Sequence, residues 1–388
     1  MAYAKVTHST FITKNIVENL VYIINYFIFA AQIKYNSIMK KKIFIFIAIV
    51  LLAGVGIIGY GIMNDERITA ARSIARIDDG LYTMTYKGDY GFDEYIAQGG
   101  AATDAEMAQY IASFLMRGFG TASAPDTTME YGCSSFVVRN ERGAILGRNF
   151  DYDFKDKCKV MIVKAYPTNG YASISTACLN FMGVPADWQP DADMQTRMSA
   201  LAAVYLPLDG INEKGLYVAD LVSGDEEETH QSTDKPDLTI TAAIRLLLDK
   251  AATVEEAVEL LASHDMNSSI GTSHHFAIAD ASGASVVVEY IGGEMFVTPT
   301  DVVTNHYLTA GEKEGIGNEL SHQRYASIAN ACNMRPNMSI ESAMKVLKEA
   351  SYPQYTQWSV VFATDACEAR YVWKCNFDAQ QHTFMIHN

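Results

Sequence analysis

One stretch of the sequence constrains this chain more than any other: Ile43–Met63 is a run of 21 residues without a charged side chain. As a helix that rises about 1.5 Å per residue, such a run spans about 30 Å, the thickness of the hydrocarbon core of a membrane. Lys40, Lys41 and Lys42 stand directly before it, and lysines tend to stay on the cytoplasmic side. The run therefore predicts a membrane-targeting leader, and we expect the residues that follow it to be exported.

Two interpretations of the segment 39–63 remain open. It is either a retained single-span anchor or a signal peptide that begins at Met39 and is later removed. A run of 21 residues is long for a signal peptide, and no A-x-A sequence follows it, which favours the anchor. Residues 1–38 hold a second apolar run, Leu20–Ala31, and form a leader of uncertain role; a start codon assigned too far upstream would produce such a sequence.

Charge is distributed unevenly along the chain. Residues 1–63 hold six Lys and a single Glu, a net charge of +5, whereas the whole chain carries −15, so the remainder carries −20. A basic, apolar beginning on an acidic body indicates a leader followed by a soluble domain. The acidic body lacks the clustered Lys and Arg that bind a phosphate backbone, which argues against a nucleic acid partner.

The residues after the leader alternate between strand and helix patterns. A capping box at Thr103–Glu106 predicts the start of a helix with an apolar face. From Cys133 onward the predicted strands are Ser134–Arg139, Ala144–Phe150, Lys159–Ala165, Tyr171–Ala177, Gly215–Leu221, His275–Asp280, Ser285–Ile291, Met295–Thr298, Ser359–Ala363, Ala369–Lys374 and Thr383–Ile386. The predicted helices are Leu238–Ala251, one capped by Thr253, His322–Asn333 and Ser339–Ala350. Because strands come in runs and helices in pairs, we expect an α+β fold, with residues 133–388 as one domain.

Six cysteines in an exported domain raise the question of disulfides. Their spacing is irregular and contains no C-x-x-C pair, and a domain of this length can bury an adequate core without crosslinks. The one pair that the spacing suggests is Cys367 with Cys375, across a turn.

Chemistry is concentrated between Gly132 and Asp151. Cys133 opens a predicted hairpin, and its returning strand brings Arg148 and Asp151 back beside the thiol. A nearby cation lowers the pKa of a thiol and raises its reactivity. The alternative, a small buried cysteine beside a structural ion pair, remains open on these residues alone. His274 and His275 lack further ligands at metal-binding spacing, and no nucleotide-binding motif occurs, so we predict neither a metal nor a cofactor.

Four separated motifs occur in an order that resembles a known family. They are Gly132–Asp151, Asp209–Leu216, Thr304-Asn305 and Arg324-Tyr325. Together they resemble the choloylglycine hydrolase and penicillin V acylase group of N-terminal-nucleophile (Ntn) hydrolases, and within it the acyltransferase-like and acid-ceramidase-like branch. The resemblance runs from about Asp78 to the end of the chain. It implies a four-layer αββα sandwich and a precursor that cuts itself at Gly132–Cys133, leaving residues 64–132 as a propeptide or small subunit before the catalytic domain 133–388.

The resemblance also implies a role for each matching residue. Cys133 would be the nucleophile, with its freed α-amine as general base, since an α-amine titrates near neutral pH. Arg148 and Arg324 would line the site, Asp151 would bind the terminal amine, and Asn305 would donate to the oxyanion hole. In place of the Asn of bile salt hydrolases and the Tyr of penicillin V acylases, the chain has Val222, which leaves only a backbone N–H for the oxyanion. This departure argues against bile-salt and penicillin specificity.

The sequence thus predicts an enzyme of the cell envelope that hydrolyses a linear, non-peptide N-acyl amide, a small molecule, through a thioester on Cys133. Transfer of the acyl group to another amine is the near alternative. The alternative from another class is a non-catalytic binding protein on the same fold. A papain-like protease finds no support in the spacing of the nine His residues. Glu289 and His306 are further residues that could line the site. The oligomeric state stays open.

Overall fold

The structure is a computed structural model that describes residues 65–115, 132–153, 158–182, 184, 187–191, 193–269 and 271–387. From Glu66 onward these residues form one compact unit. The predicted membrane run Ile43–Met63 lies outside the described residues. Among the helices within them, none is both long and apolar enough to cross a bilayer.

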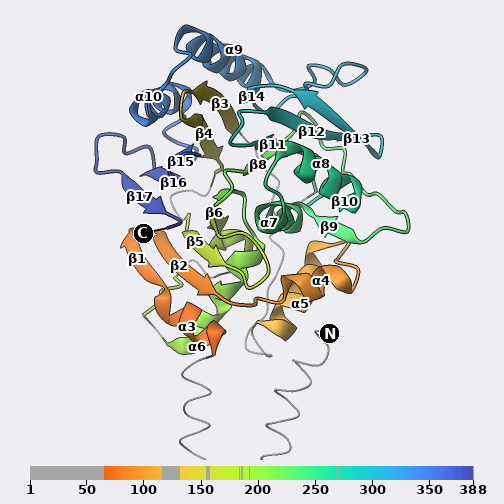
Figure 1. Ribbon diagram of the computed structural model, residues 1–388, viewed down its shortest axis with the longest axis vertical. Helices are drawn as coiled ribbons and strands as arrows, with labels where there is room; N and C mark the ends of the chain where they lie inside the picture. The colour runs from red at the N-terminus through yellow and green to blue at the C-terminus, as the bar shows by residue number, and fades with distance from the viewer. Residues whose placement is uncertain are drawn as a thin grey trace, which may run out of the picture. The chain divides into compact units, whose positions relative to one another are not determined.

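Two large β-sheets form the centre of this unit (Figure 1). The larger has nine strands in the order β1-β2-β5-β6-β7-β8-β11-β12-β13. Its strands are β1 (Ala75–Asp78), β2 (Leu81–Lys87), β5 (Val160–Tyr166), β6 (Ser173–Cys178), β7 (Asp209–Asn212), β8 (Tyr217–Val222), β11 (His274–Ala279), β12 (Ser285–Ile291) and β13 (Glu294–Pro299). All its neighbours are antiparallel except β2 and β5, which run parallel.

The second sheet has six antiparallel strands in the order β14-β3-β4-β15-β16-β17. They are β3 (Ser134–Asn140), β4 (Gly143–Asp151), β14 (Val302–Val303), β15 (Thr356–Ala363), β16 (Glu368–Trp373) and β17 (His382–Met385). A small parallel pair, β9 (Asp237–Thr239) and β10 (Asp265–Asn267), stands apart from both sheets.

Alternating side chains show how the two sheets pack. Along β5, Val160 and Ile162 belong to one buried cluster, whereas Met161 and Val163 belong to another. The first cluster also contains side chains of β3, β4, β15 and β16, so the two sheets pack face to face. Side chains of a strand alternate between its faces, and each sheet therefore has a second, outer face to cover.

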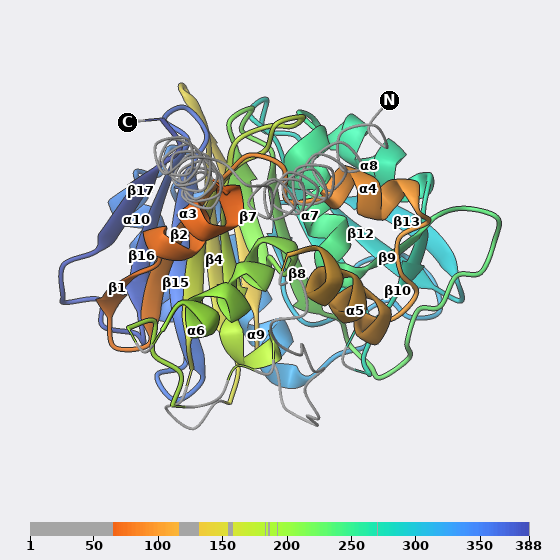
Figure 2. The ribbon, with the colours of Figure 1, turned by 90° about the horizontal axis from the view of Figure 1, so that it is seen from below.

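Helices cover both outer faces. Over the nine-stranded sheet lie α3 (Glu66–Ser73), α4 (Phe92–Ala97), α5 (Asp104–Phe114), α6 (Met194–Ser199), α7 (Ile240–Lys250), α8 (Val254–Ala262) and the 3₁₀ turns η1 (Leu179–Met182) and η2 (Ala200–Tyr205), as Figure 2 shows. Over the six-stranded sheet lie α9 (Glu319–Met334) and α10 (Ile340–Ala350). The described unit therefore has four layers, in the order helix, sheet, sheet, helix.

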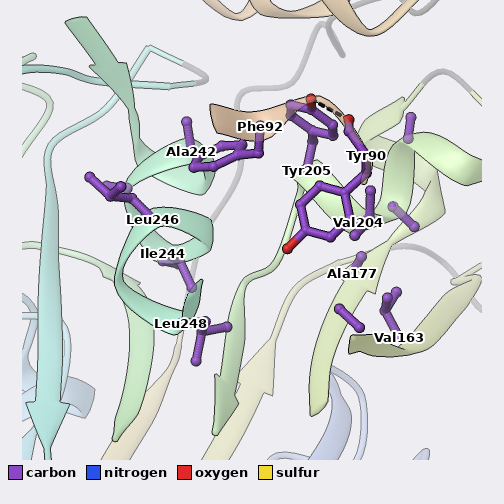
Figure 3. Close-up of a cluster of buried hydrophobic side chains, with 14 of the residues drawn as sticks. Tyr90, Phe92, Val163, Ala177, Val204, Tyr205, Ala242, Ile244, Leu246 and Leu248 are labelled. Carbon is purple, nitrogen blue, oxygen red and sulfur yellow. Dashed lines mark hydrogen bonds between the residues drawn. The ribbon is translucent and has the colours of Figure 1, made fainter. Parts of the chain in front are cut away.

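The helix layer over the larger sheet has an aromatic core. Ile244 and Leu248 of α7 point toward strand residues Val163 and Ala177 (Figure 3). Tyr90 and Tyr205 extend this cluster, and the Tyr205 hydroxyl donates to the Tyr90 carbonyl oxygen at 2.7 Å. The α7 helix packs through one apolar face against the sheet, as its sequence spacing predicted.

Residues 66–115 are built into this same core. Strand β2 pairs with β5 along its whole length, from Leu81 opposite Val160 to Lys87 opposite Tyr166. The Tyr90 hydroxyl donates to the Asp249 carboxylate at 2.6–2.7 Å, deep inside the helix layer. Residues on both sides of the predicted boundary at Gly132–Cys133 therefore share one hydrophobic core.

The α+β class predicted from the sequence is confirmed, and so are two helix caps. The Thr103 and Thr253 side chains accept hydrogen bonds from the backbone N–H groups of Glu106 and Glu256, each at 3.2 Å. The predicted helix Leu238–Ala251 starts too early, because residues 237–239 pair with β10 as a strand and the helix begins at Ile240.

The suggested Cys367–Cys375 disulfide is wrong, since both thiols are free. The two cysteines stand at opposite ends of β16, and six residues at about 3.3 Å each hold them too far apart for a bond.

Candidate active site

The β3–β4 hairpin holds Cys133 at its open end. Its turn at residues 140–143 uses Gly143 in a positive-φ conformation (φ 146°) that favours glycine. Ser134 then pairs with Asn149, which brings Cys133 beside the end of β4. The Cys133 side chain is buried, and its sulfur lies 4.0 Å from the backbone oxygen of Asp151. The hairpin therefore delivers Asp151 to the thiol, as predicted.

Arg324, on α9, connects three of the predicted site residues. Its Nη1 donates to the backbone oxygen of Cys133 at 2.9 Å and lies 3.4 Å from Asp151 Oδ2. Its Nη2 donates to Asn305 Oδ1 at 2.9 Å. The guanidinium is buried, and such a planar fork is suited to holding several oxygens in one geometry. Residues far apart in the sequence thus meet at one point.

Asn305 follows β14, and its amide is held at both ends. While Oδ1 accepts from Arg324, Nδ2 donates to the backbone oxygen of Val222 at 2.7 Å. The structure therefore brings together the two residues predicted to form the oxyanion hole. In this uncut state the Asn305 amide is directed at the Val222 carbonyl, and the donation of Asn305 and of the Val222 N–H to an oxyanion stays a prediction.

Arg148 lies on β4, fully buried. Its Nη2 donates to the backbone oxygen of Asp220 at 2.6 Å, and its Nε lies 3.7 Å from Asp209 Oδ2. Asp209 begins the Asp209–Leu216 motif, and its carboxylate also accepts from the Trp358 ring N–H at 2.9 Å. That motif, interpreted from the sequence as a turn entering a strand, thus also supplies the partner of a site arginine.

Electrostatics in this uncut state favour neutral groups. Burial raises the pKa of the Cys133 thiol, and Arg148, which lowers it, only partly compensates. The lowered thiol pKa expected from a nearby cation is therefore wrong for this state, because desolvation of the thiolate outweighs the attraction. Burial likewise raises the pKa of Asp151 to about 6, against the opposing effect of Arg324, whose 3.4 Å contact is long for an ion pair.

A residue that the sequence motifs did not reveal completes the shell around Asp151. Thr356 faces Asp151 across the β15–β4 pairing, and its hydroxyl donates to Asp151 Oδ1 at 2.6 Å. Only the strand register, which brings together residues some 200 positions apart, could have identified it. Asp151 is thereby fixed by one hydroxyl and one guanidinium.

A cavity of about 70 Å³ opens beside Gly132 and the Cys133 site. Asp151, Arg324 and Tyr352 are among its described lining residues. The guanidinium of Arg324 lies over the Tyr352 ring, 5.5 Å from its centroid. The peptide bond before Cys133 thus lies between the nucleophile and a cavity.

Glu289 and His306 lie close to the site without facing the thiol. Glu289 accepts from the backbone N–H groups of Leu308 and Thr309 and pairs with His275 at 3.0 Å. Although burial would raise it, the pKa of Glu289 is lowered to about 2 by these partners. Burial, with the nearby ring of His322, lowers the pKa of His306 to about 4. Both residues fasten the chain around Asn305 to its neighbours.

The two adjacent histidines do not share a metal site. His274 contacts the Asp220 carboxylate at 2.8 Å and His275 contacts Glu289, and neighbouring strand residues point to opposite faces. Within the part of the chain that the structure describes, no group of three or more His, Cys, Asp or Glu residues is arranged to hold a metal ion.

Comparison with known proteins identifies the segment that carries this site. Residues 133–307 match the model of the "linear amide C-N hydrolases, choloylglycine hydrolase family". A penicillin V acylase from Pectobacterium atrosepticum is 33% identical over 100 residues, which cover 23% of this chain and only 26% of that relative.

Solved structures with a similar chain course include a mutant conjugated bile acid hydrolase from Clostridium perfringens and a penicillin V acylase from Agrobacterium tumefaciens. The first is 14% identical with a TM-score of 0.48, covering 66% of this chain and 92% of that one. The second is 20% identical with a TM-score of 0.47, covering 66% and 86%.

The matched segment starts at the predicted nucleophile and includes four of the residues gathered around it, Arg148, Asp151, Val222 and Asn305. The family resemblance predicted from the motifs is therefore confirmed: through residues 133–307, the chain belongs to the linear amide C–N hydrolases of the choloylglycine hydrolase family.

Proposed function

We propose that this protein is an autoprocessed cysteine hydrolase that cleaves a linear N-acyl amide, a bond other than a peptide bond. The observation that carries the proposal is the contact of Arg324 with the Cys133 carbonyl, Asp151 and Asn305 at once. A cysteine that is merely packed in the core would not need three polar partners joined by a buried cation, which is costly to desolvate. Membership of a family of amide hydrolases supports the same conclusion.

The first proposed step is cleavage of the chain before Cys133. The sulfur attacks the carbonyl carbon of Gly132, the C–N bond breaks, and the thiol proton passes to the departing α-amine. Water then hydrolyses the thioester, which restores the thiol and leaves a carboxylate on Gly132. The cut turns the amide nitrogen of Cys133 into an amine, the general base that the described site otherwise lacks.

The second proposed step is turnover of the substrate. The α-amine takes the thiol proton, the thiolate attacks the acyl carbonyl, and the proton passes to the leaving amine as the C–N bond breaks. Asn305 and the Val222 N–H stabilise the oxyanion once substrate displaces the Asn305–Val222 contact, and one such donor contributes roughly 3–4 kcal/mol. Water releases the acyl group from the thioester, with the α-amine again as base.

Asp151 and the two arginines have supporting roles in this scheme. Asp151, already beside Gly132 and fixed by Thr356, orients the new amine. Arg148 offsets the negative charge of the thiolate, an effect that grows once water reaches the thiol. If another amine reaches the thioester before water does, the product is a transferred acyl group. An acyltransferase, as in the branch that the motifs resemble, is therefore the second candidate.

Residues 43–63 carry the proposal for location. We infer from their length and flanking lysines that they anchor the protein in the membrane with residues 66–388 exported, or are removed during secretion. Fractionation of cells that express the full chain, with and without a carbonate wash, distinguishes an anchored protein from a secreted one. Recovery of the uncut chain in the cytosol would contradict both.

Intact-mass analysis of the purified protein tests the enzyme proposal. We expect two polypeptides that meet at Gly132–Cys133, and hydrolysis of at least one N-acyl amide from a panel of aromatic, aliphatic and acidic acyl groups. Cys133→Ala removes both the cut and the activity, whereas Cys332→Ala, a cysteine of α9, leaves both unchanged. A wild-type protein that stays uncut and inactive would favour a non-catalytic binding protein on this fold.

A further inference from the structure

The cavity beside Gly132 differs in character between its floor and its rim. Asp151 and Arg324 form a polar floor, while Leu320, Tyr352 and Tyr355 supply a largely apolar rim. Leu320 is 52% exposed and Tyr355 38% exposed, unusual values for large apolar side chains next to a buried site. The rim therefore offers apolar surface that nothing in the described chain covers.

In the uncut chain this cavity is too small for a substrate. Ligand pockets usually measure about 300–1,000 Å³, and 70 Å³ holds only a few waters. Gly132 is part of the wall, and a methyl group added there would lie 2.9 Å from Asp151 Oδ2. Release of Gly132 would thus enlarge the cavity and open it toward the Cys133 thiol.

The position of Gly132 indicates which half of a substrate enters. In the amide bond before Cys133, Gly132 is the acyl half and Cys133 the amine half. The same sulfur attacks this carbonyl during processing and the substrate carbonyl during turnover. The space that Gly132 leaves is therefore the space next to an acyl group held on the sulfur.

The hydrogen bonds of Arg324 argue against an acidic acyl group. Of the five N–H groups of a guanidinium, four are engaged, by the Leu320 and Cys133 backbone oxygens, by Asp151 and by Asn305. A carboxylate entering the cavity would meet Asp151 without a free cation to pair with. An aromatic or short apolar acyl group would instead pack on Leu320 and the two tyrosine rings.

We propose that this cavity, once Gly132 has left, is the acyl-binding pocket, that Leu320 and Tyr355 set its specificity, and that it selects uncharged aromatic or short apolar acyl groups. The inference rests on the proposed function, since only the cut opens the pocket. It adds the substrate class that family membership leaves open.

Activated esters test the pocket independently of amide turnover. The processed protein is given p-nitrophenyl phenylacetate, butyrate and glutarate, and acylation of Cys133 is followed by p-nitrophenol release and intact mass. The corresponding anilides are assayed in parallel. We expect wild type to prefer phenylacetyl over glutaryl by at least tenfold. Leu320→Ala and Tyr355→Ala should each reduce phenylacetyl acylation on the order of tenfold, the effect of lost apolar contact in a pocket. Leu320→Arg should favour glutaryl.

The control is Met334→Ala, at the far end of the same helix, where the side chain is 72% exposed. If the Leu320 and Tyr355 variants acylate like this control, or if a change of amine shifts their selectivity more than a change of acyl group, the pocket assignment is overturned. Selective acylation by esters without cleavage of any anilide would support the pocket and count against the amide hydrolase. A protein that is neither cut nor acylated would overturn both.

Discussion

Arg324 Nη1 lies 2.9 Å from the backbone carbonyl oxygen of Cys133, so an arginine on the outer helix layer contacts the nucleophile residue itself. From the same guanidinium, a second nitrogen reaches Asn305. This contact fixes the end of β3 relative to β14 and α9, three elements that the sequence separates by more than 160 residues. The site therefore depends on the shape of the guanidinium as well as on its charge.

Arg324→Lys tests that dependence. A lysine keeps the charge but cannot hold the Cys133 carbonyl, Asp151 and Asn305 in one plane, so we expect processing and amide hydrolysis to fall on the order of a hundredfold. Cut fraction over time by gel, and kcat/KM on the best amide, measure the effect. Arg335→Lys, an exposed arginine just past α9, is the matched control. An Arg324→Lys protein as active as this control would show that charge alone suffices.

Gly132→Val tests how closely the scissile bond is packed. The first added carbon would lie 2.9 Å from Asp151 Oδ2 and 3.4 Å from Arg324 Nη1, both in the buried network and unable to retreat freely. We expect the cut to slow about ten- to a hundredfold, because a shift of about 1 Å at a reacting centre has effects of this size. Gly132→Ala should be intermediate.

The control for this series is Gly293→Asn, in an open turn where no atom lies within 4 Å and where asparagine tolerates the positive φ. Gly132→Val cut at the wild-type rate would mean that the attacking geometry differs from the one described.

Much of the site could be predicted from local sequence signals. Cys133, Arg148 and Asp151 lie on one hairpin, whose turn residues and short spacing indicate that they meet. Asn305 and Arg324 came only from the motif resemblance, because the distance between them and the hairpin depends on sheet order. Thr356 was missed for the same reason: nothing near it in sequence shows that β15 pairs with β4.

The fold shows a similar division. The helix caps at Thr103 and Thr253 and the hairpin turn are local features, and all three were predicted. Residues 66–115 were expected to form a separate small segment, yet β2 joins the nine-stranded sheet through a parallel pairing with β5. Parallel pairs need a long crossover, so no turn signal announces them. A strand of only three residues, β9, was likewise read as the first turn of the following helix.

Shared packing predicts that the two fragments stay together after the cut. Besides the β2–β5 pairing, the Trp373 ring N–H donates to the backbone oxygen of Asp79 at 2.8 Å, and Lys250 pairs with Asp93 at 2.6 Å. We expect one peak in size-exclusion chromatography and two polypeptides under denaturing conditions. Two separate peaks without denaturant would contradict this packing.

Tyr90→Phe should weaken that association measurably. The hydroxyl is lost from Asp249, whose carboxylate keeps only its 2.7 Å contact with Arg245 among the printed partners of its oxygens. Loss of a hydrogen bond to a buried charged group costs roughly 1.5–3 kcal/mol. The midpoint of urea unfolding should fall accordingly, whereas Tyr171→Phe, outside the helix layer, should leave it unchanged. Equal midpoints would indicate that the Tyr90 contact contributes nothing to stability.

The raised pKa of Asp151 predicts how stability depends on pH. Its carboxyl titrates near pH 6 in the folded state and near 3.9 when unfolded, so the folded state holds the proton more tightly. Between these values the unfolded chain releases its proton first, and the free energy of unfolding falls as pH rises, by on the order of 3 kcal/mol in total. Asp151→Asn cannot titrate and lacks this loss.

Urea unfolding at pH 4 and pH 7 measures the effect, with both proteins in a Cys133→Ala background so that neither is cut. The stability of Asp151 protein minus that of Asp151→Asn should be greater at pH 4 than at pH 7. Asp378→Asn, at a side chain that is 92% exposed, should show no such difference. Parallel pH profiles for Asp151 and Asn at this position would mean that the carboxyl is already ionised below pH 4. Arg324 would then stabilise the charge more than burial disfavours it, and Asp151 would be ready to bind an ammonium group at any pH at which the fold persists.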